Sequence, residues 1–387
     1  MTLLLKILFW FSVFVIFWAN IGYQVSIVIL GKIFTRKNKK NKNYLPSVTI
    51  MVVAHNEEKV ILEKLKNLEN IDYPNEKIKV LIASDNSTDH TNEIVEKYIN
   101  SNPQRDVTLY KARKRMGKTN AQNEAQKLVS SEFLVMTDAN SMLDESSIKE
   151  LMSSFSEPDI SYVAGKLLYT NSDNSDTSSN ESIYWNLDLK IREIESNIQT
   201  ITAGNGALYA VRNTKYVDFD PIESHDSSMP IYYAVNNQRA IANHEAIAYE
   251  KAGENTEDEF NRKVRMNRVL LSHIIPSLKI LNVFKYKWFT YFYLGHRSSR
   301  YLLWFAHALL LFSNVSLAIN HALYAWILIL HILILVIGVV QHVVSTKSII
   351  LNLIYYYLMT IVAQYKGIWK ALSGESKPFW EKAESTR

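Results

Sequence analysis

The run from Leu3 to Ile33 restricts the fold of this chain more than any other feature, because its only charged side chains are Lys6 and Lys32. About 20 apolar residues of helix cross a bilayer, and this run is long enough to do so with some tilt. A cleaved signal peptide would have a shorter apolar core of about 7 to 15 residues, followed by small residues. We therefore interpret residues 1–34 as an N-terminal transmembrane helix.

A basic segment follows directly, with five lysines and arginines between residues 36 and 42. Positive residues beside a span favour the cytoplasmic side, so we expect residues 35–46 to be a juxtamembrane linker and the domain after them to be cytoplasmic. Nucleic acid is the alternative use of such a run, but its position makes topology and contact with membrane lipids the simpler interpretation. The net charge of +5 gives no reason to expect a nucleic-acid partner. The chain has no cysteine, which excludes disulfides and thiolate metal sites.

Residues 47–276 have the alternating pattern of an α/β domain. Short apolar runs predict buried strands, and amphipathic runs predict helices between them. The expected strands are 48–54, 78–84, 107–110 and 133–137, and the expected helices are 57–68, 88–99 and 118–128. Such alternation predicts a mostly parallel sheet with helices on both faces. A polar stretch from 170 to 180 is expected to be a loop, before a helix whose apolar stripe runs from Ile183 to Ile198.

The character of the chain changes again after residue 276. From 277 to 300, aromatic side chains alternate with cations, which predicts an interfacial amphipathic segment. The expected C-terminal elements are transmembrane helices within 301–365, with Tyr301–Ile319 and Ala322–Val344 as strong candidates and Ile349–Gln364 as a weaker one, and a tail at 366–387. Three spans would leave the lysines of the tail outside, against the charge rule. Either the last segment is interfacial or re-entrant, or the charge bias there is too weak to decide.

The stretch from Phe133 to Leu143 is where polar side chains meet the predicted sheet. An apolar run stops at Asp138, and Asn140 follows at the C-terminal edge of the strand. Open α/β sheets bind ligands at that edge. A carboxylate and an amide oxygen there can hold a hard divalent cation, or the ribose of a nucleotide. A strand that ends in an ordinary polar turn is the alternative interpretation.

Three further stretches lie at or near strand ends. Residues 53–58 (Val-Ala-His-Asn-Glu-Glu) and 84–89 (Ser-Asp-Asn-Ser-Thr-Asp) are also compatible with simple helix caps. Residues 113–120 place three cations and a glycine before a helix, which suits a diphosphate. This loop is not a Walker A motif, because the required earlier glycine falls on Ala112. No Gly-X-Gly-X-X-Gly opens the first helix, which disfavours a dinucleotide fold.

Two later stretches complete the set. His225 and Asp226 precede Ser-Ser-Met-Pro. Arg262 and Arg265 lie three residues apart in a helix expected from about Glu257, so they share one helix face. A solvated basic face is the alternative interpretation of this pair.

In this order, these stretches resemble the membrane-bound family-2 glycosyltransferases, which include cellulose, chitin and hyaluronan synthases and many bacterial exopolysaccharide enzymes. The resemblance covers nearly the whole chain, including its flanking membrane segments. The matching motifs are 54–58, 84–89, 117–121 and 138–140, where Asp-Ala-Asn stands for the family's Asp-X-Asp. The resemblance implies an α/β, Rossmann-like glycosyltransferase A-type domain, with a mostly parallel mixed sheet and helices on both faces, plus transmembrane helices at both ends.

The resemblance also implies roles for individual residues. Asp138 would contact the ribose or a divalent metal, Mg²⁺ or Mn²⁺, and Asn140 would bind the metal through its amide oxygen. The cation would neutralise charge on the leaving diphosphate. Asp226 matches the general base, which removes the proton of an acceptor hydroxyl as it attacks the anomeric carbon and inverts it. The residues implied in binding the nucleotide sugar are Ala54, Asn56, Glu57, Asp85 at the base, Lys118, Asp138, Arg262 and Arg265.

Three departures from the family pattern affect these expectations. Asn140 replaces an aspartate and removes a charge from the metal site. His225 stands where an acidic residue usually precedes the base, and its protonation would shift the pKa of Asp226. The Gln-X-X-Arg-Trp motif of processive synthases ends here in Met266, so the ring that stacks on the acceptor sugar is missing. Trp185 or Tyr184 would offer a ring instead, although ordinary core aromatics are the simpler interpretation.

The sequence therefore predicts an inverting glycosyltransferase that is integral to a bacterial cytoplasmic membrane. It would move a sugar from a nucleotide sugar to a growing cell-surface polysaccharide, and a UDP-sugar is the first candidate for the donor. Polysaccharide export proteins are potential partners. An alternative is transfer of a single sugar to a polyprenyl-linked or other lipid acceptor. A third interpretation is a non-catalytic membrane scaffold of an export complex, which the departures at Asn140, His225 and Met266 suggest.

Overall fold

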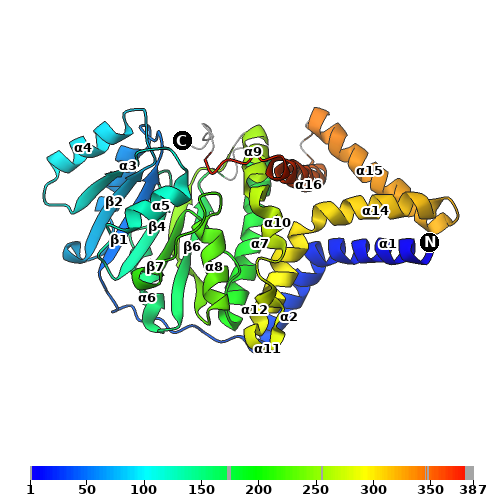
Figure 1. Ribbon diagram of the computed structural model, residues 1–387, viewed down its shortest axis with the longest axis horizontal. Helices are drawn as coiled ribbons and strands as arrows, with labels where there is room; N and C mark the ends of the chain where they lie inside the picture. Colours follow the sequence, from blue (N-terminus) through cyan, green and yellow to red (C-terminus); the bar gives the residue numbers. More distant parts are fainter. Residues whose placement is uncertain (1, 172–175, 254–255, 345, 347, 380–387) are drawn as a thin grey trace.

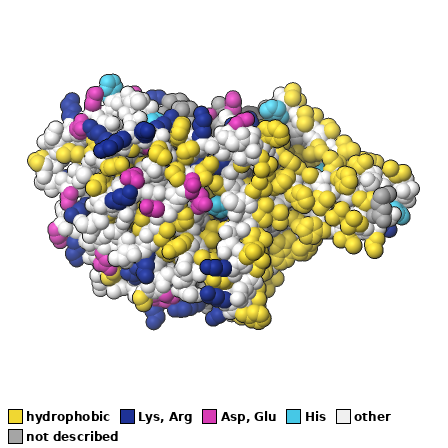
Figure 2. Space-filling view, viewed as in Figure 1, with side chains coloured by type: hydrophobic (Ala, Val, Ile, Leu, Met, Phe, Trp, Pro, Cys, Tyr) yellow, Lys and Arg dark blue, Asp and Glu magenta, His cyan; other side chains and the backbone are white. Residues whose placement is uncertain are grey.

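The computed structural model describes residues 2–171, 176–253, 256–344, 346 and 348–379 (Figure 1). A sheet with helices on both faces occupies one end of the molecule, and long helices extend from the other end. In the space-filling view, charged side chains are scattered over the sheet domain, whereas hydrophobic side chains cover the region of α1, α14 and α15 (Figure 2). The polar and apolar halves of the chain are therefore segregated in space as they are in sequence.

The described residues contain one eight-stranded sheet, in the order β3-β2-β1-β4-β7-β6-β8-β5. β1 pairs in parallel with β2 and β4, β2 with β3, and β6 with β8, whereas β7 is antiparallel to β4 and β6, and β5 to β8. The strands are β1 (Val48–Ala54), β2 (Ile78–Ser84), β3 (Val107–Lys111), β4 (Phe133–Asp138), β5 (Met142–Leu143), β6 (Ile160–Tyr169), β7 (Leu208–Arg212) and β8 (Arg239–Glu250). The predicted mixed, mostly parallel sheet is confirmed.

Alternate residues of β1 face opposite sides of the sheet and build two cores. Val48, Ile50 and Val52 pack with α3, α4 and α6, whereas Met51 and Val53 pack with α5 and α8. All of β1 is buried, which is why it reads as an unbroken apolar run. The helices of this domain are α3 (Ile61–Glu69), α4 (Thr91–Ser101), α5 (Lys118–Gln126), α6 (Ser147–Ser153), α7 (Asp176–Ile198), α8 (His225–Val235) and α9 (Thr256–Met266).

The prediction of a loop from 170 to 180 is wrong for residues 176–180, because α7 begins at Asp176. Residues 172–175 lie outside the described residues. The C-terminal part of the predicted apolar stripe is buried, since Ile191 and Ile198 pack against Tyr23 and Phe292. This helix therefore joins the sheet domain to the apolar elements.

The apolar N-terminal run is helical throughout, as α1 (Thr2–Phe17), a π-helical turn (Trp18–Gly22) and α2 (Tyr23–Phe34). Among the described residues, two helices are long and apolar enough to cross a membrane, Thr2–Phe34 and α15 (Ala322–Val344). The expected span at 301–319 appears as α14 (Leu303–Ala318), which meets the same test only together with Trp288–Tyr301, a segment bent from it by 59°. The short elements between α9 and α14 are α10 (Leu270–Ile274), α11 (Val283–Tyr286), α12 (Trp288–Phe292), a π-helical turn (Tyr293–Ser298) and α13 (Ser299–Tyr301).

The weaker C-terminal candidate continues beyond its expected end as α16 (Ile349–Leu372), which is not among the candidate spans of the described residues. α16 packs against α9. The Tyr356 hydroxyl donates to Glu259 of α9 over 3.0 Å. At Gly367 a Cβ atom would lie 2.7 Å from the Cβ of Asn267, so only glycine permits this close approach. The helix is therefore held against the domain that carries the predicted site.

The basic linker is attached to the sheet domain through ion pairs. Arg36 lies 2.7 Å from Glu157, Lys40 lies 2.9 Å from Glu245, and Lys42 lies 3.0 Å from Glu150. These three pairs direct the chain from α2 along the domain toward β1. Much of the charge that we assigned to topology and lipid contact is thus also used within the protein.

Candidate active site

The predicted ligand edge of the sheet is formed by three neighbouring parallel strands. Ala54 of β1 lies opposite Ser84 of β2, and Val53 lies opposite Asp138 of β4. The carboxyl ends of β1, β2 and β4 therefore meet at one edge. This register brings residues 54–58, 84–89 and 138–140 together, although they are far apart in sequence.

The first two motifs hold each other in place. The carbonyl of Ala54 accepts from the Asp85 amide over 2.8 Å. The Asn56 side-chain oxygen accepts from the Thr88 amide over 2.8 Å, and the Glu57 amide donates to the Thr91 hydroxyl over 2.7 Å. Asn56 has a φ of 55°, a left-handed conformation that asparagine tolerates better than most residues. These residues shape the turns after β1 and β2.

Asp85 ties the third motif to the second. Its buried carboxylate accepts from the backbone amides of Met116 and Gly117 over 3.0 and 2.8 Å. Gly117 has a φ of 93°, and a Cβ atom there would lie 2.4 Å from the Pro378 carbonyl oxygen. Asp85 therefore fixes the loop that precedes α5. Its predicted contact with the nucleotide base stays a prediction.

Lys118, Asp138, Gly206 and Asp226 meet at the centre of the site. Lys118 forms an ion pair with Asp138. A Cβ atom on Gly206 would lie 2.9 Å from Lys118 Nζ, 3.5 Å from Asp138 Oδ2 and 4.0 Å from Asp226 Oδ2. Burial lowers the pKa of Lys118, but Asp138 and Asp226 outweigh burial and raise it. A charged lysine thus stands between the two predicted carboxylates.

Helix α9 brings further cations toward this centre. Burial, with Arg262 and Arg268 nearby, lowers the pKa of Arg265 to about 9, while Asp138 raises it. Arg265 is thus within the electrostatic reach of Asp138. Arg262 instead contacts Glu259 through Nε and Nη2 over 2.7 and 3.1 Å. The charge of Arg265 is thus linked to Asp138, and the Arg262 guanidinium pairs with Glu259 of its own helix.

Sequence reasoning missed the segment 202–206, Thr-Ala-Gly-Asn-Gly, which leads into β7. Its Asn205 amide donates to the Gly165 carbonyl over 2.7 Å, and its side-chain oxygen accepts from the Ala207 amide over 3.2 Å. A Cβ atom on Gly204 would lie 1.9 Å from the Tyr162 hydroxyl. Two glycines within three residues, in a chain with 11 glycines, were the available signal.

The residues at 138–140 fit a divalent metal only as part of a larger ligand set. In the described part of the chain, no group of three or more acidic, histidine or cysteine side chains is arranged to hold a metal. Asp138 and Asn140 offer a carboxylate and an amide oxygen, and Mg²⁺ is often bound by one or two protein carboxylates together with substrate phosphates. The two residues therefore fit a cation that a diphosphate helps to bind.

His225 does not titrate as expected from the sequence. Its side chain is buried, with Nδ1 2.8 Å from the Gln122 side-chain oxygen and Nε2 2.9 Å from the Tyr216 hydroxyl. Burial, reinforced by Lys118, lowers the pKa of His225 to about 3. The imidazole is therefore neutral near neutral pH, and a protonated His225 is not available to shift Asp226.

The two proposed substitutes for the missing tryptophan are not confirmed as acceptor platforms. The Trp185 indole donates to the Leu167 carbonyl over 3.1 Å, and the Arg192 guanidinium lies 4.9 Å from the centre of its ring. The side chain of Tyr184 lies outside the described residues. Met266, which replaces the motif tryptophan, is 61% exposed.

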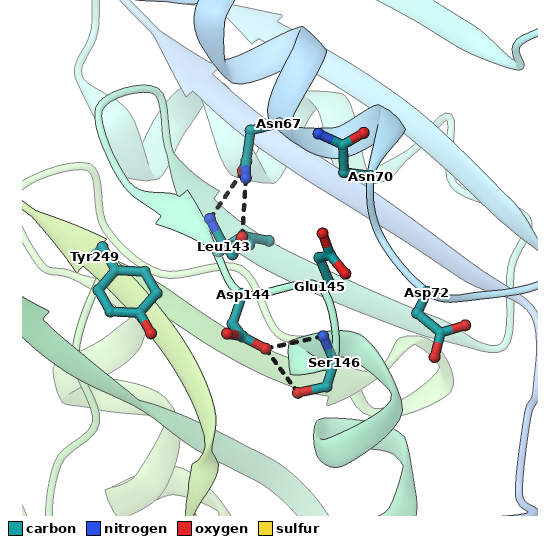
Figure 3. A pocket seen from close by; sticks show the side chains of 8 residues that line it. All are labelled: Asn67, Asn70, Asp72, Leu143, Asp144, Glu145, Ser146 and Tyr249. Carbon is teal, nitrogen blue, oxygen red and sulfur yellow. Dashed lines mark hydrogen bonds between the residues drawn. The ribbon is translucent and has the colours of Figure 1, made fainter.

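A cavity of about 520 Å³ lies outside this centre, between α3, β5 and β8 (Figure 3). None of the predicted site residues lines it. Asn67 holds the Leu143 backbone through both its amide atoms, each over 2.8 Å, and Asp144 accepts from the Ser146 amide over 3.0 Å. Asn67 and Asp144 therefore have local structural roles at this cavity, and we do not assign the nucleotide sugar to it.

The sequence and fold of this chain are similar to those of known glycosyltransferases. Residues 49–217 match the model of glycosyl transferase family 2. A β-monoglucosyldiacylglycerol synthase from Nostoc sp. is 33% identical over 145 residues, which are 37% of this chain and 30% of that protein. A poly-β-1,6-N-acetyl-D-glucosamine synthase from Staphylococcus aureus is 29% identical over 149 residues, 35% of each chain. The chain thus matches about a third of the length of these relatives.

A solved structure resembles nearly the whole chain. The mannosyltransferase PcManGT from Pyrobaculum calidifontis, in complex with GDP-Man and Mn²⁺, has a TM-score of 0.73 and covers 95% of this chain and 99% of that one. At 19% identity the likeness concerns the fold. The glycosyltransferase A-type fold is therefore confirmed. Residues 49–217 form a glycosyltransferase domain of family 2, as the sequence motifs predicted.

Gly206 is a sensitive position for any activity of this centre. We expect Gly206→Ala to abolish sugar transfer while the melting temperature stays close to wild type, because the added methyl group would displace the Lys118 ammonium. Gly253→Ala is the matched control, since its Cβ atom would meet nothing within 4 Å. Transfer rates and melting curves of both variants test this, and an active Gly206→Ala would contradict it.

The buried His225 also predicts a pH dependence of stability. The unfolded chain binds a proton near pH 6.5 and the folded chain does not, so this contribution to stability is lost as the pH falls below about 6.5. We expect the free energy of unfolding to fall by about 2 kcal/mol through this group between pH 7 and pH 5. Melting curves at both pH values should show a smaller decrease for His225→Gln than for wild type. Equal decreases would contradict the prediction.

Proposed function

We propose that the chain is an inverting glycosyltransferase that takes a sugar from a nucleotide sugar and transfers it to an acceptor at the membrane. The observation that carries this proposal is the meeting of Lys118, Asp138 and Asp226 around Gly206 at the carboxyl edge of the sheet. The mannosyltransferase of similar fold was solved with a nucleotide sugar, which supports a donor of this class. A UDP-sugar is our first expectation from the motifs.

The residues around Gly206 supply the parts of a direct displacement. Asp226 accepts the proton of the acceptor hydroxyl as that oxygen attacks the anomeric carbon. Lys118 and Arg265 place positive charge where the leaving diphosphate gathers negative charge. Asp138 and Asn140 would hold a divalent cation, which supplies further charge neutralisation when bound. A single displacement inverts the anomeric carbon and requires no covalent sugar on the protein.

We propose a growing cell-surface polysaccharide as the acceptor and the cytoplasmic face of a bacterial membrane as the location. The poly-N-acetylglucosamine synthase relative and the candidate spans support this choice. A second candidate is a single transfer to a lipid acceptor. The exposed Met266 in place of the tryptophan and the glucosyldiacylglycerol synthase relative favour it.

Transfer by the purified full chain tests the reaction and separates the two acceptors. The protein in lipid nanodiscs is given radiolabelled UDP-glucose, UDP-N-acetylglucosamine or GDP-mannose, and the products are divided into high-mass polymer and one-sugar lipid. We expect Asp226→Asn to lower transfer by about 10² to 10⁴-fold, the usual contribution of a general base. Asp218→Asn, on an exposed carboxylate, is the control. Full transfer by Asp226→Asn would show that Asp226 is not the general base, whereas no transfer by the wild type would support the scaffold interpretation. One-sugar lipid as the sole product would exclude the polysaccharide acceptor.

Removal of divalent cations tests the metal assignment separately. We expect EDTA to stop transfer, and Mg²⁺ or Mn²⁺ to restore it, because in this proposal a cation at Asp138 and Asn140 neutralises charge on the leaving diphosphate. Transfer by Asp138→Ala should not be restored by either ion at concentrations that restore transfer by the wild type. Transfer that continues undiminished in EDTA would show that the metal assignment is wrong.

A further inference from the structure

A buried cluster of charged side chains lies where α7 meets the segment before α14. Both ring nitrogens of His296 contact carboxylates, Nδ1 with Glu195 over 2.7 Å and Nε2 with Asp188 over 3.0 Å. Asp188 also pairs with Arg300 over 2.7 Å and with Arg192 Nε over 2.6 Å. We call these five residues the α7 ion cluster.

The α7 ion cluster is connected to the N-terminal candidate span. The Tyr23 hydroxyl, in α2, donates to Glu195 over 2.6 Å, and the Tyr23 ring stacks on His296. A Cβ atom on Gly295 would lie 2.4 Å from the Tyr23 ring, so the two segments are in close contact. Three separate parts of the chain thus converge on this cluster, namely α2, α7 and residues 295–300.

Burial makes the geometry of the α7 ion cluster strict. The side chains of Asp188, Glu195 and His296 are 4%, 0% and 3% exposed. Buried charges are tolerated only when they are paired with good geometry. Burial raises the pKa of Asp188, but Arg192, His296 and Arg300 together hold it well below its ordinary value. Hydrogen bonds from His296 and Arg300 to Asp188, and from His296 to Glu195, therefore tie α7 to residues 296–300, and Arg192 adds an ion pair with Asp188.

Arg192 also reaches out of the cluster toward the site. Its Nη1 donates to the Gly204 carbonyl over 2.6 Å, and the Gly204 amide donates to the Asp226 carbonyl over 2.8 Å. The Tyr162 hydroxyl occupies the space where a Cβ atom on Gly204 would lie, so glycine is required at this position. The backbone of Asp226 is thus linked through one glycine to a buried arginine.

We propose that Arg192 is a positioning residue for Asp226, and that contact between the apolar N-terminal helix and residues 295–300 fixes Arg192 in turn. The Nε atom of the Arg192 guanidinium pairs with Asp188, and its Nη1 atom aligns the segment 202–206 through the Gly204 carbonyl. This inference rests on the proposed role of Asp226 as the base. It makes the alignment of the base dependent on correct docking of the membrane-side helices.

Arg192→Gln is the direct test, with Arg212→Gln as a matched control. Arg212 is also a partly buried arginine that donates to backbone carbonyls, those of Ile160 and Phe155, and lies against aromatic rings. It lies opposite Phe133 at the far end of β4 from Asp138. Loss of Arg212 should therefore remove similar interactions without reaching the site.

We expect Arg192→Gln to lower kcat by about 10-fold or more with little change in KM for the nucleotide sugar, because misplacement of a catalytic group affects the reaction more than donor binding. Arg212→Gln should lower the melting temperature but leave kcat near wild type. Amide exchange followed by mass spectrometry should be faster in peptides covering 200–208 and 224–230 for Arg192→Gln alone. If that variant does not fold, Arg192→Lys replaces it, because one ammonium can stay with Asp188 but cannot also reach Gly204.

Two results would overturn the inference. One is a decrease in kcat that is proportional to the decrease in melting temperature, with the same proportion in the Arg192 and Arg212 variants. The other is amide exchange at 200–208 that is the same in the Arg192 variant as in the wild type. A wild type that transfers no sugar would reject the proposed function. The exchange measurement would still decide whether Arg192 holds the backbone of Asp226.

Discussion

The parallel pairing of β1 with β2 and β4 is the constraint on which the rest of the site depends. It brings three strand ends to one edge, so that short polar turns from distant parts of the sequence meet. Asp85 then fastens the loop before α5, and that loop carries Lys118 to Asp138. The antiparallel strand β7 continues the sheet beyond β4 and brings Gly206 between these groups. Each later contact thus presupposes the register of the first three strands.

The sequence was informative where burial is complete and local. β1 and β2 have the predicted bounds. β1 is buried throughout and appears as a continuous apolar run, whereas β2 is fully buried only from Leu81 to Ser84. The start of α7 was missed, because polar residues at 176–180 gave no apolar period. Asp138, Lys118 and Asp226 came from motifs. The role of Gly206 was not predictable from the sequence. It depends on the side chains of Asp138 and Lys118, which lie 68 and 88 positions earlier in the chain and come near Gly206 only in the folded sheet.

Charge is organised differently in the two halves of the sheet domain. At the carboxyl edge of β1, β2 and β4, Lys118 is paired with Asp138, and Arg265 lies in the field of the same carboxylate. Where α7 meets residues 295–300, the charges of the α7 ion cluster are buried and paired with one another, and Arg192 contacts the Gly204 carbonyl. The first arrangement suits groups that change partners, whereas the second suits groups that stay in place.

The contact of residues 377–379 with the loop before α5 has a practical consequence. Pro378 lies against Gly117, the Arg268 guanidinium donates to the Lys377 carbonyl over 3.1 Å, and the Phe379 ring lies 4.8 Å from the Arg115 guanidinium. A polypeptide joined directly to Phe379 would begin beside the loop before α5, whereas the N-terminus lies at the tip of α1 (Figure 1). Purification tags therefore belong at the N-terminus. A fluorophore near residue 379, by contrast, would lie beside the loop before α5 and would report on its proposed contact with the nucleotide sugar.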